Sequence, residues 1–218
     1  MQYKYHHIFF DLDGTLINSG LGIINAVKYA LNKYGIKENN PIILKSFVGP
    51  PLNQQFIDCY NFSFEQSLEA VQYFREYYSI KGILENNVYP QIPELLNILA
   101  QNDLKLLIAS SKPEKFVNMI LAQHNLLKYF SFIGGSLLDG SRINKDDVIS
   151  YVINEMQINN FNDCLMVGDR KYDILGAKKF KFTSVGVTYG YGDYSELQKA
   201  KADYLIDNPL DLINIIQH

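Results

Sequence analysis

The residues around position 11 constrain the fold of this chain more than any other stretch. An apolar run, Ile8-Phe9-Phe10, is followed directly by Asp11-Leu12-Asp13-Gly14-Thr15. Such a run is typical of a buried strand, and Gly14 allows the chain to turn away after it. In open α/β sheets, ligands bind at the carboxyl ends of the strands. We therefore expect Asp11 and Asp13 to lie at a strand end where a ligand can bind.

Two neighbouring carboxylates need a counter-charge. At a separation of 4 Å they repel each other by about 4 kcal/mol when the effective dielectric constant is near 20. A cation, a shared proton or solvent must offset that repulsion. For Asp11 and Asp13 alone, an Asp-Gly turn in water is the simpler interpretation, so partners elsewhere in the chain have to decide between a turn and a site.

The composition excludes several classes of protein. The chain has 218 residues, 47% of them hydrophobic and 20% charged, with a net charge of −3. It has no basic block of the kind that binds nucleic acid, no apolar run of roughly 18 residues and no apolar leader at its N-terminus. Cys59 and Cys164 show no metal-type spacing. We expect a cytoplasmic protein with reduced thiols that binds neither membranes nor nucleic acid.

Hydrophobic periodicity divides the chain into two kinds of structure. Residues 17–80 are predicted to be helical, with no strand. Beyond about residue 90, short apolar runs alternate with helical patterns, which favours a mostly parallel sheet with helices on both faces. The predicted strands span 105–110, 131–134, 164–168, 183–187 and 203–206, and the predicted helices span 93–101, 113–124, 146–156, 172–180, 194–200 and 210–216. The expected fold is thus α/β, with a Rossmann-like core of residues 1–16 and 84–218 and an inserted helical block at 17–83.

The later strand ends also carry polar residues. The second predicted strand ends in Ser110-Ser111-Lys112-Pro113, before a helix whose free backbone N–H groups favour an anion. Lys145 precedes the next helix, and Gly168-Asp169 ends the strand after it, with Asp173 about one helical turn further on. Each of these features alone has an ordinary explanation, as a helix cap or a solvated lysine.

Together, these residues indicate a site for a phosphoryl group. Four carboxylates, a hydroxyl and a lysine each follow a predicted strand end. Oxygen ligands without nearby His or Cys suit Mg²⁺. A Mg²⁺ ion, a lysine and a helix N-terminus around one point can bind and activate a phosphate ester.

This set of motifs resembles the haloacid dehalogenase superfamily of phosphatases. The order Asp-Leu-Asp-Gly-Thr, Ser110, Lys145 and Gly-Asp-Arg-x-x-Asp is similar to the four signature motifs of that superfamily, over essentially the whole chain. The helical block resembles its helical cap domain. Three shorter stretches resemble the phosphoglycolate phosphatase and 5′-nucleotidase-like branch: Phe47-Val48-Gly49-Pro50-Pro51-Leu52, Ser110-Ser111-Lys112-Pro113 and Asp139-Gly140-Ser141-Arg142-x-x-Lys145.

The resemblance implies covalent catalysis on small phosphomonoesters. Asp11 would attack phosphorus and form an aspartyl-phosphate, and Asp13 would act as the general acid and base. Asp11, the backbone carbonyl of Asp13 and Asp169 would bind Mg²⁺, and Asp173 would bind it directly or orient its ligands.

The phosphoryl oxygens and the substrate would meet further residues. By the same resemblance, Ser110 and the backbone N–H groups of Asp13 and Ser111 would hold the phosphoryl oxygens, and Lys145 would pair with Asp11 and the phosphate. The candidates for the face of the cap that meets the substrate are Lys45, Gly49, Pro50 and Leu52. His6, His7 and His124 have no role in this mechanism.

Several alternatives remain open on the sequence alone. A phosphosugar mutase of the same superfamily shares the aspartyl-phosphate. A phospho-receiver domain or a non-catalytic binding scaffold is a more remote alternative. The expected partner is a small phosphorylated metabolite, and the expected assembly is a monomer or a homodimer.

Overall fold

The computed structural model describes residues 3–217 and divides into two compact units. The first unit comprises residues 1–17 and 88–218, and the second comprises residues 18–87. The chain passes between them through two short strands that pair with each other, β2 (Ile17–Asn18) and β3 (Asn87–Val88).

A six-stranded sheet forms the centre of the first unit. Its strands lie in the order β5-β4-β1-β6-β7-β8, and every neighbouring pair is parallel. The strands are β1 (His7–Phe10), β4 (Lys105–Pro113), β5 (Phe132–Ser136), β6 (Cys164–Gly168), β7 (Thr183–Val187) and β8 (Tyr204–Ile206). The predicted parallel α/β fold is therefore confirmed.

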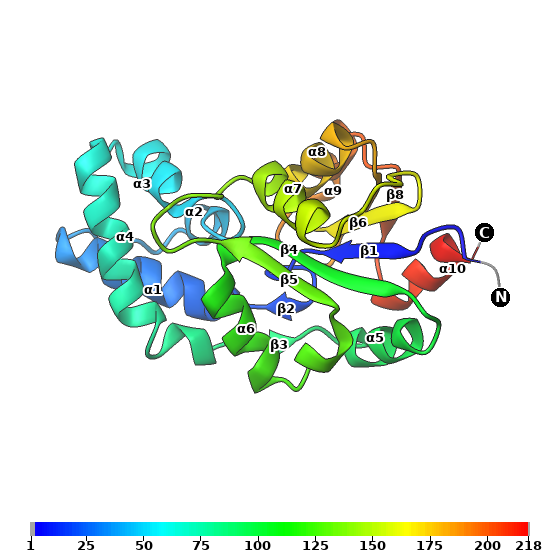
Figure 1. The fold of residues 1–218 in the computed structure, drawn as a ribbon. Helices are drawn as coiled ribbons and strands as arrows, with labels where there is room; N and C mark the ends of the chain where they lie inside the picture. Colours follow the sequence, from blue (N-terminus) through cyan, green and yellow to red (C-terminus); the bar gives the residue numbers. More distant parts are fainter. Residues whose placement is uncertain (1–2, 218) are drawn as a thin grey trace. The chain divides into compact units, whose positions relative to one another are not determined.

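Helices cover both faces of this sheet (Figure 1). On one face α7 (Lys145–Glu155) and α8 (Lys171–Lys179) pack on the strands, and on the other face α5 (Ile92–Ala100) and α6 (Glu114–Gln123) do so. The remaining helices of this unit are η2 (Leu127–Tyr129), α9 (Tyr194–Lys199), η3 (Pro209–Asp211) and α10 (Leu212–Ile216). Because both faces are covered, successive residues of β1 are buried, from Ile8 to Phe10.

The second unit is built from helices. They are α1 (Gly20–Lys33), α2 (Pro41–Ser46), α3 (Leu52–Tyr60), α4 (Phe64–Tyr78) and the short η1 (Gly82–Leu84). α4 packs against α1 and α3. Ser63 caps α4 through a capping box: its hydroxyl accepts from the Gln66 N–H, and the Gln66 side chain accepts from the Ser63 N–H.

Several predicted boundaries differ from the structure. Residues 17–80 were expected to hold no strand, yet Ile17 and Asn18 form β2, whose partner β3 lies far along the chain and has no local signal. Pro113 was expected inside the first turn of a helix. Its ψ of 128° is extended, so it precedes α6 as the cap. β4 continues past residue 110 to Pro113 through an irregular pairing with β5.

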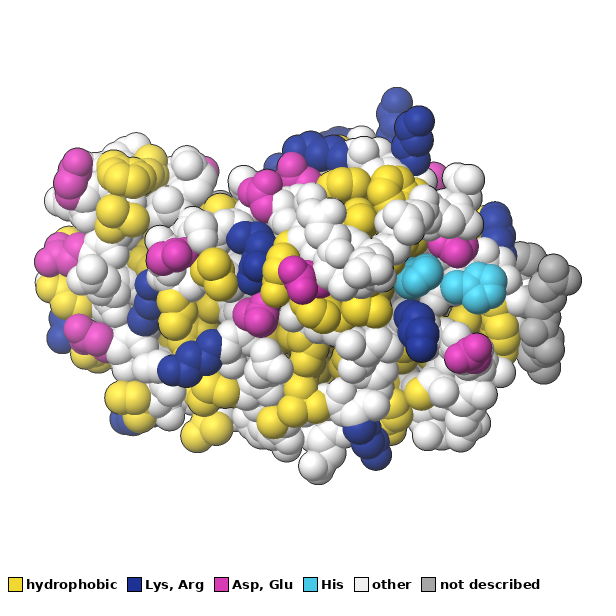
Figure 2. Space-filling model, viewed as in Figure 1, with side chains coloured by type: hydrophobic (Ala, Val, Ile, Leu, Met, Phe, Trp, Pro, Cys, Tyr) yellow, Lys and Arg dark blue, Asp and Glu magenta, His cyan; other side chains and the backbone are white. Residues whose placement is uncertain are grey.

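The surface is mixed in charge. Acidic and basic side chains are interspersed over the visible face (Figure 2). Within residues 3–217, no helix combines the length and the apolar character needed to cross a membrane. Both cysteines are free thiols, with Cys59 partly exposed and Cys164 buried.

Candidate active site

Strand register brings the predicted acidic residues together. Phe10 of β1 lies opposite Ile108 of β4 on one side and Val167 of β6 on the other. Asp11 follows Phe10, Ser110 lies two residues after Ile108, and Asp169 lies two residues after Val167. The carboxyl ends of three adjacent strands therefore supply these side chains, and Asp173 joins them from the first turn of α8.

Lys145 binds two of the carboxylates. Its Nζ lies 2.8 Å from Asp11 Oδ1 and 2.9 Å from Asp173 Oδ1, and it donates to the carbonyl oxygen of Ala109 at 2.7 Å. Burial lowers the pKa of Lys145, but the charges of Asp11 and Asp173 outweigh this effect and hold the pKa above its ordinary value. Lys145 is the first residue of α7, so its ammonium is a fixed, buried positive charge.

Asp173 and Asp169 are buried acids in different settings. Burial raises the pKa of Asp173 to about 6, although Lys145 opposes the shift. Its Oδ2 accepts from the Arg170 backbone N–H at 3.0 Å, while its Oδ1 faces Lys145. Burial, together with the charges of Asp173 and Asp11, raises the pKa of Asp169 well above its ordinary value. Asp173 is thus already held by two partners of its own chain.

Asp169 offers a free oxygen. Its Oδ2 accepts from the Tyr191 backbone N–H at 2.7 Å. Within the described part of the chain, its Oδ1 is buried and has no hydrogen-bond partner. A buried carboxylate oxygen without a donor costs free energy unless a ligand satisfies it. The orphaned oxygen therefore indicates a ligand position beside Asp169.

Lys112 is a member of the site that the sequence did not single out. Its Nζ lies 2.7 Å from Asp13 Oδ2 and 3.0 Å from Oδ1, and both side chains are about nine-tenths buried. Its backbone N–H also donates to the Ser110 hydroxyl at 3.4 Å. The stretch Ser110-Ser111-Lys112-Pro113 marked the right region, but only the folded chain shows that the lysine reaches Asp13.

The side chains of the site carry more negative than positive charge, and a divalent cation would balance the difference. When all four buried acids are ionised, the two buried ammonium groups leave two negative charges without a counter-charge; the residues are Asp11, Asp13, Asp169, Asp173, Lys112 and Lys145. Ligand oxygens of Asp11, Asp169 and Asp173 lie within 4.8 Å of one another. Oxygen donors without sulfur or nitrogen are the set that Mg²⁺ prefers.

Two glycines allow the carboxylates to approach the backbone closely. Gly14 has a φ of +86°, and a Cβ added there would stand 2.1 Å from Asp169 Oδ2. A Cβ added at Gly168 would stand 2.1 Å from the carboxyl carbon of Asp173. Both positions therefore require glycine because the acidic side chains occupy the space where a larger residue would put its side chain.

The predicted substrate-facing residues lie in the second unit. Lys45 is exposed near the end of α2, and Gly49 lies between α2 and α3 with a φ of +105°. Pro50 is buried, and the partly buried Leu52 begins α3. Their contact with a substrate stays a prediction.

Comparison with known proteins agrees with this geometry. The family described as haloacid dehalogenase-like hydrolase matches residues 8–187. A 5′-nucleotidase of Pseudomonas aeruginosa is 39% identical over 89% of this chain and 88% of its own length. A phosphoglycolate phosphatase of Vibrio parahaemolyticus is 28% identical over 96% of this chain and 95% of its own length.

A solved structure extends the agreement to the fold. The crystal structure of a predicted phosphatase from Clostridium acetobutylicum is 43% identical, covers 97% of each chain and superposes with a TM-score of 0.93. The relatives confirm the predicted enzyme class, a hydrolase of phosphomonoesters. The family match covers most of the chain, and the chain therefore belongs to the haloacid dehalogenase-like hydrolase family.

Proposed function

We propose that this chain is a Mg²⁺-dependent phosphatase that hydrolyses small phosphomonoesters through an aspartyl-phosphate on Asp11. The observation that carries the proposal is the buried arrangement of Asp11, Lys145 and Asp169 at the carboxyl ends of adjacent parallel strands. A carboxylate that attacks a phosphate dianion needs cations nearby, because both groups are negatively charged. Lys145 supplies such a charge 2.8 Å from Asp11.

The proposed reaction uses two carboxylates. An oxygen of Asp11 forms a bond to phosphorus while the bond from phosphorus to the ester oxygen breaks. Asp13 gives a proton to the departing oxygen and then takes one from the water that hydrolyses the aspartyl-phosphate. Lys112, in contact with Asp13, fixes the position of that carboxylate for both steps.

The remaining side chains bind the metal and the phosphoryl group. Asp11, Asp169 and the backbone carbonyl of Asp13 would hold Mg²⁺, and the orphaned Oδ1 of Asp169 supports this assignment. When bound, the ion supplies positive charge that offsets the repulsion between nucleophile and phosphate. Because Asp173 is held by Lys145 and by the Arg170 N–H, we assign it an orienting role. Ser110 and the N–H groups of Ser111 and Asp13 would hold the phosphoryl oxygens.

The names of the relatives suggest the first substrates to test. A nucleoside 5′-monophosphate comes first, because the 5′-nucleotidase is the more similar of the two curated relatives described above, and phosphoglycolate comes second. Residues 17–83 would act as a cap that selects among such metabolites. We expect the enzyme to act in the cytoplasm as a monomer or a homodimer.

Phosphate release from a panel of phosphomonoesters tests the proposal. The panel is run with Mg²⁺ and with a chelator, on the wild type, on Asp11→Asn and on Asp103→Asn, which makes the same change at an exposed position. We expect at least one substrate to reach a kcat/KM of about 10⁴ M⁻¹s⁻¹ with the wild type and with Asp103→Asn, but not with Asp11→Asn. Release that survives Asp11→Asn contradicts the mechanism. Labelling of Asp11 by a sugar bisphosphate without phosphate release would instead support the mutase.

A further inference from the structure

A second cluster of metal-ligating side chains lies at the opposite edge of the sheet from Asp11. His7 is the first residue of β1, Cys164 is the first residue of β6, and Asp163 immediately precedes Cys164. These are the amino-terminal ends of two neighbouring strands, whereas the candidate active site lies at their carboxyl ends. The two clusters are therefore chemically and spatially separate.

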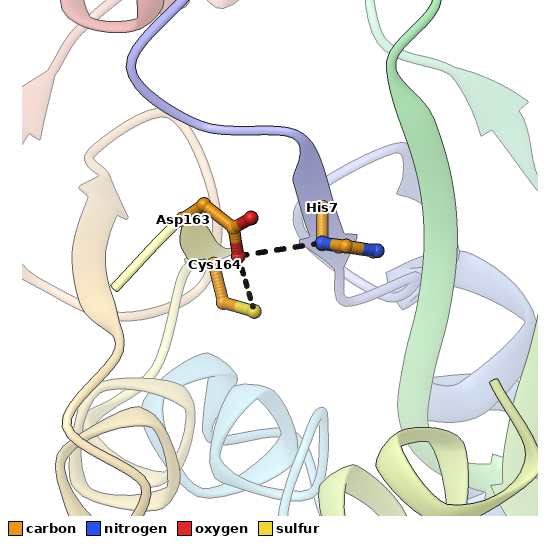
Figure 3. Close-up of side chains that lie close together, drawn as sticks. All are labelled: His7, Asp163 and Cys164. Carbon is orange, nitrogen blue, oxygen red and sulfur yellow. Dashed lines mark hydrogen bonds and ion pairs between the residues drawn. The ribbon is translucent and has the colours of Figure 1, made fainter. Parts of the chain in front are cut away.

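Strand pairing fixes this cluster. His7 and Cys164 are directly paired in the parallel register of β1 and β6, so their side chains project from the same face of the sheet. The backbone N–H groups of His6 and His7 both donate to the carbonyl oxygen of Asp163, at 2.9 and 3.2 Å. Figure 3 shows the Asp163 carboxylate in contact with both the His7 and the Cys164 side chains.

The spacing of the ligand atoms is close to that of a tetrahedral metal site. His7 Nδ1 lies 3.5 Å from Asp163 Oδ1, and Cys164 Sγ lies 3.7 Å from the same oxygen. All three ligand atoms lie within 4.8 Å of one another. Zinc bond lengths of about 2.3 Å to sulfur and roughly 2.0–2.2 Å to nitrogen and oxygen place tetrahedral ligand atoms roughly 3.3–3.6 Å apart.

The imidazole nitrogen indicates that a ligand belongs here. His7 Nδ1 is buried and makes no hydrogen bond to any described residue. The 3.5 Å contact with Asp163 is an ion pair only if the imidazole is protonated. The thiol, by contrast, is satisfied, because it lies within hydrogen-bond distance of the Asn160 carbonyl oxygen at 3.4 Å and of Asp163 Oδ1 at 3.7 Å. A cation must therefore displace the thiol proton in order to bind to sulfur.

We propose that His7, Asp163 and Cys164 bind a divalent transition-metal ion, with Zn²⁺ as the best match to one nitrogen, one oxygen and one sulfur ligand. On binding, a bond forms between the metal and sulfur, the S–H bond breaks and the proton passes to solvent. Water or the exposed His6, whose Nδ1 lies 3.9 Å from Asp163 Oδ2, supplies the fourth ligand. The ion ties the start of β1 to the start of β6.

Cobalt titration tests this site without reference to phosphatase activity. Co²⁺ is added to chelator-treated, reduced protein, and the near-ultraviolet absorption that arises from a cobalt–thiolate bond is recorded. The background variant is Asp169→Asn, so that the acidic cluster at the other edge does not compete for the ion. We expect the absorption to saturate at one equivalent and to vanish when Zn²⁺ displaces Co²⁺.

Variants assign the absorption to the proposed ligands. Cys59→Ser, which changes the other thiol, should leave the absorption unchanged, whereas Cys164→Ser should abolish it. His7→Gln and Asp163→Asn keep the sulfur and should weaken Co²⁺ binding by at least about tenfold. They also test the site if Cys164→Ser fails to fold, which circular dichroism detects. No thiolate absorption in the Asp169→Asn background, absorption that survives Cys164→Ser, or unchanged affinity in both His7→Gln and Asp163→Asn would overturn the proposal.

Discussion

The buried lysine of the active site is the group whose removal should affect stability most clearly. Lys145 separates Asp11 from Asp173, at 2.8 and 2.9 Å, and its side chain is only 5% exposed. Lys145→Met keeps most of the volume and removes the charge. Asp11, Asp169 and Asp173 are then left close together without this cation. Loss of one partner from a buried ion pair typically costs about 3–5 kcal/mol.

The size of this effect should depend on pH. Burial raises the pKa of Asp173 from 3.8 to about 6 in the folded protein, so its ionisation costs stability as the pH rises from about 4 to 6. Lys145 reduces that cost, because its charge lowers the pKa of Asp173. In Lys145→Met the pKa of Asp173 should therefore rise further. We expect a loss of about 3–5 kcal/mol at pH 8, or roughly 10 °C in Tm, and a smaller loss at pH 5, where Asp173 is largely protonated in both proteins.

Thermal and urea unfolding at pH 5 and pH 8, at one ionic strength and with a chelator present, measures the difference. The matched control is Lys179→Met, which makes the same change in an exposed ion pair with Asp146. That control should alter the free energy of unfolding by less than about 1 kcal/mol at either pH. Equal Tm values for Lys145→Met and the wild type at pH 8, or the same gap at both pH values, would refute this account of the site.

Three further outcomes test the same geometry. Mg²⁺ at a hundred times its Kd should raise the Tm of the wild type by roughly 5–10 °C but should not raise that of Asp169→Asn. An equal rise in both proteins would show that Asp169 is not a ligand of the metal. Gly14→Ala and Gly140→Ala both place a side chain at a φ of +86°, but only the former puts a Cβ 2.1 Å from Asp169 Oδ2, while the latter meets nothing within 4 Å. Mg²⁺-dependent phosphate release should therefore fall about 100-fold in Gly14→Ala and stay near wild type in Gly140→Ala, and equal losses would exclude the contact with Asp169 as the cause. Lys112→Met should lower kcat/KM for phosphate release at least tenfold while circular dichroism stays unchanged, because Asp13 loses the ammonium 2.7 Å away; an unchanged kcat/KM would show that Lys112 does not position Asp13.

The sequence by itself determined the fold class and the chemistry of the strand ends. The apolar run before Asp11 and the run before Gly168-Asp169 each indicated a buried strand ending in an acid, and both strands are present. The capping box at Ser63 likewise depends on residues only three positions apart. These features are local, because residues within one strand or one helical turn fix them.

Only the tertiary structure decided which distant residues meet. Register in the parallel sheet placed β1 between β4 and β6, which brought Lys112 to Asp13 and His7 beside Cys164. The backbone N–H of Tyr191, which fixes Asp169, and the pairing of β2 with β3 had no local signal either. Such contacts depend on the order and register of strands that are remote in the chain. That information is carried by the packing of the whole sheet and not by any single segment.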